Sequence, residues 1–218
     1  MKPLILLNFK TYPEAAGKKA LPLAKQLQKV RSQKYQVVIA PSLLTIKEIA
    51  EQTSLTVFSQ HTDLASLGTF TGKISAVELK AIGVKGTLLN HSERKIPFPI
   101  LKKIMAACKE EKLVTVICAS SLIEVKLVAR LTPDYLAYEP PELIGGKVSV
   151  TKAKPEIIAK AVQAVKEISS KTKVLCGAGV QNKEDFLKAL MLGAHGVLIG
   201  HALPKARNPG KFLQKLME

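Results

Sequence analysis

Eight short apolar runs recur along the chain and alternate with longer amphipathic stretches. The runs are Leu4–Leu7, Val37–Ala40, Leu55–Ser59, Gly86–Leu89, Val114–Cys118, Tyr135–Tyr138, Lys173–Cys176 and Gly196–Ile199. Nearly continuous apolar runs of this length predict strands that are buried on both faces, as in an all-parallel sheet. Helical spacing of apolar residues between them is clearest at Ala15–Val30, Leu43–Gln52, Ile100–Glu111, Leu122–Leu131, Pro155–Ile168, Lys183–Leu192 and Pro209–Met217.

This alternation predicts an α/β fold in a single domain, residues 1–218, because no linker, low-complexity tract or change of composition divides the chain. Eight strand–helix units favour a closed (β/α)8 barrel. An open doubly wound sheet is the alternative, although no Gly-x-Gly-x-x-Gly motif follows the first run to support it.

The net charge of +16 raises the question of nucleic-acid binding. The lysines are scattered along helical stretches, however, and neither an arginine-rich tract nor aromatics interleaved with basic residues are present. We therefore expect no nucleic-acid partner and a basic, soluble surface, whose field would speed the arrival of an anionic small substrate. A basic nucleic-acid-associated protein with a degenerate catalytic site is the alternative.

No apolar run approaches the ~18 residues that span a membrane, and the amino terminus lacks the features of a signal peptide. We expect no membrane association. Three cysteines at no metal-like spacing favour a reduced, cytoplasmic setting. The four histidines form no His-x-x-x-His pair, so we expect neither a metal nor another cofactor.

Polar residues follow several of the predicted strands, and in a barrel all eight carboxyl ends face the same side. Asn8 and Lys10 follow the first run, and His91 and Glu93 lie in the five polar residues after the fourth. Glu139 follows the sixth. The barrel would bring a lysine, a histidine and a glutamate from distant parts of the chain to one mouth.

Glu139 stands directly before Pro140-Pro141, which excludes both helix and ladder pairing, and two glycines follow at Gly145 and Gly146. A carboxylate at the end of a strand, next to a segment that is stiff at one end and bends freely at the other, predicts a catalytic base beneath a lid at residues 140–150. A solvated strand-end glutamate before an ordinary proline-rich turn is the alternative.

Small residues follow the last two strands, at Gly177, Gly179 and Gly200, the last of which precedes His201. Small side chains leave backbone N–H groups uncovered, and barrels hold phosphate groups in this way. Two such loops on adjacent strands predict a phosphorylated substrate. The residues thus favour proton chemistry on a small phosphorylated carbonyl compound. A barrel isomerase or lyase for a larger, indole- or ribose-linked phosphate is the alternative, but it would want a wider mouth and other acid–base partners.

At this point the chain resembles the triosephosphate isomerase family, and its archaeal, short-chain branch in particular. The matching segments are Asn8–Tyr12, Gln60–Asp63, Gly68–Gly72, Asn90–Arg94, Glu139–Gly145, Lys152–Glu156 and Cys176–Gly179. They extend over nearly the whole chain. The Asn-His-Ser-Glu-Arg and Glu-Pro-Pro-Glu-Leu-Ile-Gly runs are the most specific.

The resemblance implies the TIM-barrel fold and the interconversion of glyceraldehyde 3-phosphate and dihydroxyacetone phosphate. Glu139 would be the base that moves the proton between adjacent carbons, and His91 would polarise the carbonyl as a neutral imidazole. Lys10 would offset the charge of the enediolate and the phosphate, with Asn8 hydrogen-bonding beside it. Glu93 would support Lys10 and His91. These are expectations that rest on the family.

The resemblance further implies a lid in which Ile144 lies next to Gly145, whose N–H would grip the phosphate. This chain departs from the archaeal Ile-Gly-Thr-Gly pattern after Gly145, since Gly146 and Lys147 follow. His201 stands where a small residue is expected, so its side chain would crowd the phosphate or bond to it. The family also implies a homodimer or homotetramer, with Thr71 in the interface.

Overall fold

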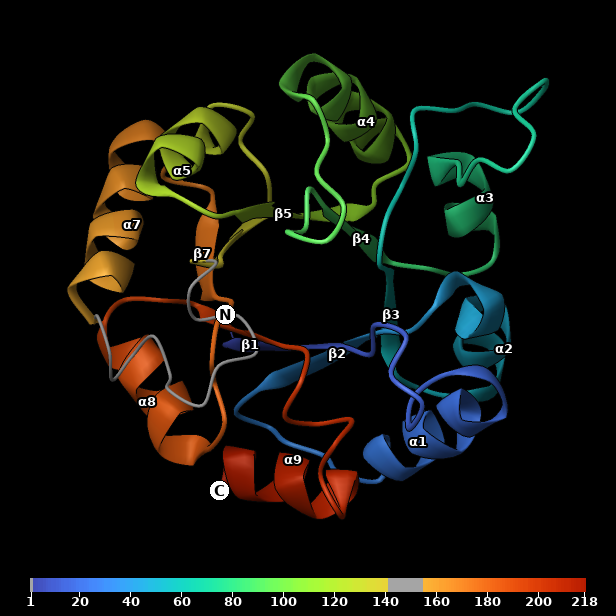
Figure 1. Ribbon diagram of the computed structural model, residues 1–218, viewed down its shortest axis with the longest axis vertical. Coiled ribbons are helices and arrows are strands. Elements are labelled where there is room, and N and C mark those ends of the chain that lie inside the picture. The colour runs from blue at the N-terminus through green and yellow to red at the C-terminus, as the bar shows by residue number, and fades with distance from the viewer. Residues whose placement is uncertain (1, 141–154) are drawn as a thin grey trace.

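The computed structural model describes residues 2–140 and 155–218, and within them parallel strands close into a barrel in chain order (Figure 1). The strands are β1 (Leu4–Asn8), β2 (Gln36–Ala40), β3 (Thr56–Ser59), β4 (Gly86–Leu89), β5 (Val114–Ala119), β6 (Tyr135–Tyr138), β7 (Lys173–Cys176) and β8 (Gly196–Ile199). The eighth strand pairs with the first. The predicted closed barrel is confirmed, and the open sheet is excluded.

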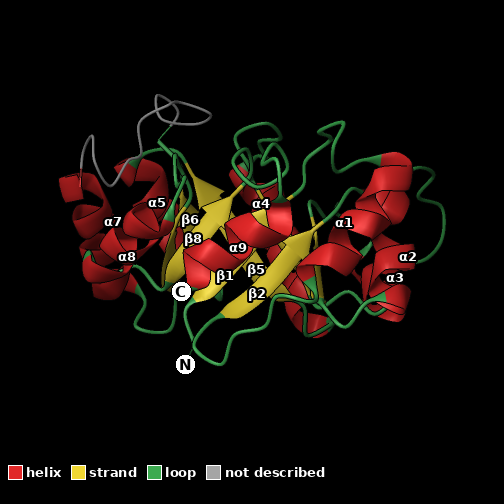
Figure 2. Cartoon of the chain, turned by 90° about the horizontal axis from the view of Figure 1, so that it is seen from below, coloured by secondary structure: helices red, strands yellow, loops and turns green. Residues whose placement is uncertain are grey.

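Helices surround the strands on the outside of the barrel (Figures 1 and 2). They are the 3-10 helix η1 (Gly17–Lys19) and the α-helices α1 (Ala20–Leu27), α2 (Leu43–Gln52), α3 (Ala76–Ala81), α4 (Phe98–Glu110), α5 (Leu122–Ala129), α7 (Pro155–Ile168), α8 (Lys183–Met191) and α9 (Pro209–Met217). In the described part of the chain, no helix has the length and apolar character needed to cross a membrane. The lid predicted at 140–150 lies almost wholly outside the described residues.

Two helical predictions need correction. The helix predicted over Ala15–Val30 is a 3-10 turn followed by a shorter α-helix, because Gly17 takes a positive φ of 53° that an α-helix does not accept. Helix α3 is an addition to the predicted set, since six residues are too few to show a helical period. Its local signal is the cap Ser75, whose side chain accepts a hydrogen bond from the N–H of Glu78.

The core follows the two-residue period of the strands. Leu4 and Leu6 of β1 belong to the cluster that fills the barrel, whereas Ile5 and Leu7 belong to the layer between strands and helices. Successive side chains of a strand point to opposite faces, so every strand of a helix-covered barrel buries both faces. This explains why the apolar runs are nearly continuous.

Closure of the barrel requires a glycine where β8 meets β1. Gly196 lies beside Leu4 and has a φ of 150°, and a Cβ atom added there would lie 2.0 Å from the Leu4 carbonyl oxygen. Any side chain would push β8 away from β1, and backbone atoms cannot rotate aside as a flexible side chain can.

Replacement of this glycine tests the closure. We expect Gly196→Ala to lower the free energy of unfolding by about 3 kcal/mol or more, from overpacking against backbone. Gly17→Ala is the matched control, because Gly17 also has a positive φ but nothing lies within 4 Å of its Cβ position; it should cost about 1 kcal/mol. Urea unfolding measures both, and equal losses would contradict this view of the closure.

Candidate active site

Lys10 is held over the barrel mouth by a strained turn after β1. Its φ is 47°, and its N–H donates to Asn8 Oδ1 at 3.0 Å. From the β3 loop, Gln60 Nε2 donates to the carbonyl oxygens of Lys10 (3.1 Å) and Ala40 (2.9 Å). Non-glycine residues adopt a positive φ only where the surroundings impose it. The turn therefore keeps the lysine at the mouth, with 15% of its side chain exposed.

Glu93 forms an ion pair with this lysine, in which Lys10 Nζ lies 2.6 Å from Glu93 Oε1. The glutamate side chain is 61% exposed. Because exposed ion pairs contribute little to stability, the pair's effect is to direct the ammonium group and not to hold the fold.

His91 follows β4 and points into the same mouth. The backbone N–H of Glu93 donates to His91 Nδ1 at 3.2 Å. A nitrogen that accepts a hydrogen bond carries no proton, so this contact assigns the ring hydrogen to Nε2. Burial, together with the positive charge of Lys10, lowers the pKa of His91 to about 4. The imidazole is therefore neutral at physiological pH, and it is a donor at Nε2.

Glu139 follows β6, where its N–H continues the ladder by donating to the Ala119 carbonyl at 2.8 Å. The Oε1 atom lies 3.5 Å from His91 Nε2, and Oε2 has no hydrogen-bond partner among the described residues. Burial raises the pKa of this carboxyl to about 7, although a hydrogen bond with the Cys118 thiol and the charge of Lys10 oppose the rise. Glu139 is thus a poorly solvated carboxylate poised to take a proton near neutral pH.

A cysteine and a glycine shape the slot that holds this carboxylate. Burial, reinforced by the negative charge of Glu139, raises the pKa of the Cys118 thiol well above its usual value, so the thiol stays protonated. At Gly177 an added Cβ would lie 2.4 Å from Glu139 Cγ. The N–H of Gly177 donates to the Tyr138 carbonyl at 2.9 Å. Gly177 therefore serves the site by having no side chain, and its N–H is engaged in the ladder.

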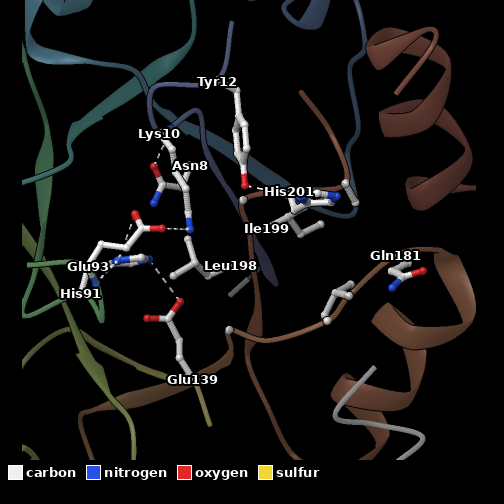
Figure 3. Close-up of a pocket in the computed structure, with 15 residues that line it drawn as sticks. Asn8, Lys10, Tyr12, His91, Glu93, Glu139, Gln181, Leu198, Ile199 and His201 are labelled. Atoms are coloured by element: carbon white, nitrogen blue, oxygen red, sulfur yellow. Dashed lines mark hydrogen bonds and ion pairs between the residues drawn. The ribbon is translucent and has the colours of Figure 1, made fainter. Parts of the chain in front are cut away.

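These side chains line one cavity of about 250 Å³ at the carboxyl ends of the strands. Figure 3 shows the imidazole of His91 between Glu93 and Glu139, with Lys10 and Asn8 beside them. The predicted residues that line the cavity are Asn8, Lys10, His91, Glu93, Glu139, Gly177, Gly179, Gly200 and His201. Ile144 and Gly145 lie outside the described residues.

Two polar side chains that also line this cavity, Tyr12 and Gln181, are absent from the predicted set. Tyr12 lies edge-on to His201, with ring centroids 5.8 Å apart, and its hydroxyl is 3.4 Å from His201 Nδ1. The Lys205 ammonium lies 5.3 Å from the centre of the Tyr12 ring. Tyr12 comes two residues after Lys10, and its place in the first loop and in the matching segment Asn8–Tyr12 could have indicated it.

No group of three His, Cys, Asp or Glu side chains in residues 2–140 and 155–218 is arranged to hold a metal ion. The groups that the cavity does contain are a carboxylate near its pKa, a neutral imidazole donor and a fixed ammonium ion. Such a set moves a proton and stabilises the negative charge that results. Fold and cavity together define the class: a (β/α)8-barrel enzyme of acid–base chemistry.

Comparison with known proteins gives the family. The model of the triosephosphate isomerase family matches residues 3–217. The chain is 41% identical over 216 residues to the triosephosphate isomerase of Methanocaldococcus jannaschii, covering 99% of each chain. It is 40% identical to that of Archaeoglobus fulgidus (98% of this chain, 96% of the relative) and 41% identical to that of Methanosarcina mazei (99% and 97%).

The chain therefore belongs to the triosephosphate isomerase family. This family of isomerases interconverts the two triose phosphates, glyceraldehyde 3-phosphate and dihydroxyacetone phosphate, in glycolysis and gluconeogenesis. The predicted family and fold are confirmed.

The buried charge of Glu139 should cost the fold stability. Its pKa is raised from 4.5 to about 7, so the folded state disfavours the ionised form, and this cost grows from pH 4.5 to pH 7 and is constant above. We expect Glu139→Gln to be more stable than the wild type at pH 8 by up to roughly 3 kcal/mol, and this gain should shrink toward pH 5. Urea unfolding at several pH values measures it. A gain that does not change with pH, or a loss at pH 8, would contradict the assignment.

Proposed function

We propose that Glu139 is the base of the isomerisation and moves one proton between adjacent carbons of the triose phosphate. The carboxylate takes a proton from the carbon next to the carbonyl, and the electron pair left behind forms the carbon–carbon double bond of an enediolate. The protonated Glu139 then returns the proton to the neighbouring carbon. The observation that carries this proposal is the buried Glu139 oxygen with no partner among the described residues, in a cavity shared with Lys10 and His91.

His91 polarises the carbonyl through its Nε2 hydrogen and shuttles the hydroxyl proton between the two oxygens. A neutral imidazole suits this task because its acidity lies closer to that of the enediol than the acidity of an imidazolium does. The hydrogen bond from the Glu93 N–H supports this role, since it directs the donor nitrogen inward.

Lys10 stabilises the negative charge that develops on the substrate oxygen, with Asn8 hydrogen-bonding alongside. Its ammonium is held in place before the reaction begins, by the turn at Asn8 and by the ion pair with Glu93. Charge that is already oriented needs no reorganisation as the transition state forms, and it acts strongly in a cavity shielded from water.

The phosphate lies between the loops after β7 and β8, where the backbone N–H groups of Gly179, Gly200 and His201 serve as donors. A lid at 140–150, with Ile144 and the N–H of Gly145, completes the binding and shields the enediolate from water, which otherwise promotes loss of phosphate. The match to the triosephosphate isomerase family supports a three-carbon phosphate over an indole- or ribose-linked one.

Assembly into a homodimer or homotetramer, and a cytoplasmic location, are part of the same proposal. Apolar side chains exposed on the loop after β3 support assembly: Leu67 is 68% exposed and Phe70 43%. Contiguous exposed apolar patches on a protein surface often mark a contact with a partner. The expected interface role of Thr71 stays a prediction.

The catalytic assignment is tested by a coupled assay with glyceraldehyde 3-phosphate. We expect Glu139→Asp to lower kcat by about 10²-fold or more, because a carboxylate withdrawn by about 1 Å no longer reaches the carbon. In the wild type, kcat/KM should fall as the pH drops below about 7, where Glu139 takes up a proton, whereas His91 stays neutral. Circular dichroism controls for folding. Undiminished turnover in a folded Glu139→Asp variant would refute the role of the base.

His201 offers a test of the phosphate site. We assign the Tyr12 hydroxyl as the donor to His201 Nδ1, 3.4 Å away, which places the ring hydrogen on Nε2, where it can be donated to the phosphate. We expect His201→Ser to raise KM and the inhibition constant of inorganic phosphate together, by about fivefold, with kcat nearly unchanged, as loss of one exposed hydrogen bond to an anion implies. Tyr12→Phe should cause a smaller change of the same sign. A lower KM in His201→Ser would show that the ring crowds the phosphate.

A further inference from the structure

One carboxylate that lines no part of the cavity receives more hydrogen bonds than the catalytic side chains do. Glu124 lies in the first turn of α5, and Lys95 Nζ contacts both of its oxygens, at 2.8 and 2.9 Å. Asn90 Nδ2 donates to Oε1 at 2.7 Å. The N–H and the hydroxyl of Ser120 both donate to Oε2 at 2.7 Å. Glu124 thus ties the loop after β4 to the loop after β5.

The loop after β4 is the one that carries His91 and Glu93, and Glu124 contacts it on both sides of them. Asn90 directly precedes His91 and has a positive φ of 57°. Its Nδ2 also donates to the Cys118 carbonyl at 2.9 Å, and its Oδ1 accepts from the N–H of Ile96 at 3.0 Å. A residue held in a left-handed conformation by three side-chain hydrogen bonds fixes the direction in which the next side chain leaves the backbone.

The cluster of Glu124, Lys95, Asn90 and Ser120 also carries charges that affect the pKa values of the site residues. The positive charge of Lys95 contributes to a lower pKa for both His91 and Glu139. Burial acts to raise the pKa of Glu124, but its bonds to Lys95, Ser120 and Asn90 outweigh this and lower it. Glu124 is therefore ionised at neutral pH and offsets the charge of Lys95.

Other groups that face the two catalytic side chains come from several elements. Lys10 of the β1 loop and Glu93 of the β4 loop act on both His91 and Glu139. The Cys118 thiol on β5 faces Glu139, and His91 and Glu139 face one another. Replacement of Glu124 or Lys95 removes none of these groups, so opposite pKa shifts in the two variants would report the charge of the cluster.

We infer that Glu124 is a positioning residue for the isomerisation: it locks the loop that presents His91 and balances the charge of Lys95 beside the acid–base pair. This inference rests on the proposed roles of His91 and Glu139. By contrast, the surface pair Lys47–Glu51 has a single contact of 3.9 Å between side chains that are both more than half exposed. It offers a matched control.

The test compares Glu124→Gln, Lys95→Met and the double variant with the control Glu51→Gln. Glu124→Gln should lower kcat about tenfold with KM within twofold, and it should move the acid limb of kcat/KM to lower pH, because Lys95 is then unbalanced. Lys95→Met should move the limb to higher pH. The double variant should return the limb to the wild-type position while kcat stays low. Glu51→Gln should change nothing.

A purely structural role would not produce opposite movements of the acid limb. If both single variants leave the limb in place, or move it in one direction, the inference is wrong. NMR titration of the His91 imidazole gives a readout that does not depend on turnover, and its midpoint should shift down in Glu124→Gln and up in Lys95→Met. If Glu124→Gln fails to fold, Lys95→Met still tests the direction in which the acid limb moves. The Lys95 side chain is 43% exposed, so its replacement should be tolerated. A wild-type protein inactive on triose phosphates would refute the proposed function. The NMR shifts would still test the effect of Glu124 and Lys95 on His91, because they do not depend on turnover.

Discussion

The site depends on one energetically costly arrangement, in which the Glu139 carboxylate is kept out of water. Nearby positive charge favours its ionised form but does not supply all of its hydrogen bonds. Glu139 is almost fully buried, and one of its oxygens lacks a partner among the described residues. A fully paired carboxylate would be too weak a base for a carbon acid, and a solvated one would have an ordinary pKa. The slot between Cys118 and Gly177 keeps the group between these limits, because a thiol is a weak donor and a glycine leaves room.

The barrel supplies what a local motif could not. Lys10, His91 and Glu139 are far apart in sequence and come from β1, β4 and β6, whose carboxyl ends open on the same side (Figure 3). Two residues in left-handed conformations, Lys10 and Asn90, turn the chain at the points where it leaves a strand. Each is held by side-chain hydrogen bonds from a neighbouring loop, so rigidity at the mouth is built from contacts between loops and not from the strands alone.

The strands, and the meeting of Lys10, His91 and Glu139 in one cavity, could be predicted from the sequence because both follow from general rules. The catalytic roles of the three residues came from the family resemblance. Burial on two faces makes the apolar runs continuous, and the shared side of the carboxyl ends selects Lys10, His91 and Glu139. The remaining features of the site depend on close contacts between residues that are distant in sequence, and residue spacing does not reveal such contacts. The N–H of Gly177 is used by the ladder, and only the structure shows that its missing side chain admits Glu139. The tautomer of His91 is set by a backbone contact, and Glu124 looks like an ordinary first-turn acid until its three partners are in place.

The most direct measurement is the titration of the Glu139 carboxyl itself, followed by ¹³C NMR of protein labelled at glutamate, with Glu139→Gln used to assign the resonance. The desolvated slot predicts a midpoint near pH 7, while the His91 imidazole stays neutral over the same range. A midpoint near the ordinary value of 4.5 would mean that the carboxylate is solvated, which contradicts a catalytic base kept out of water.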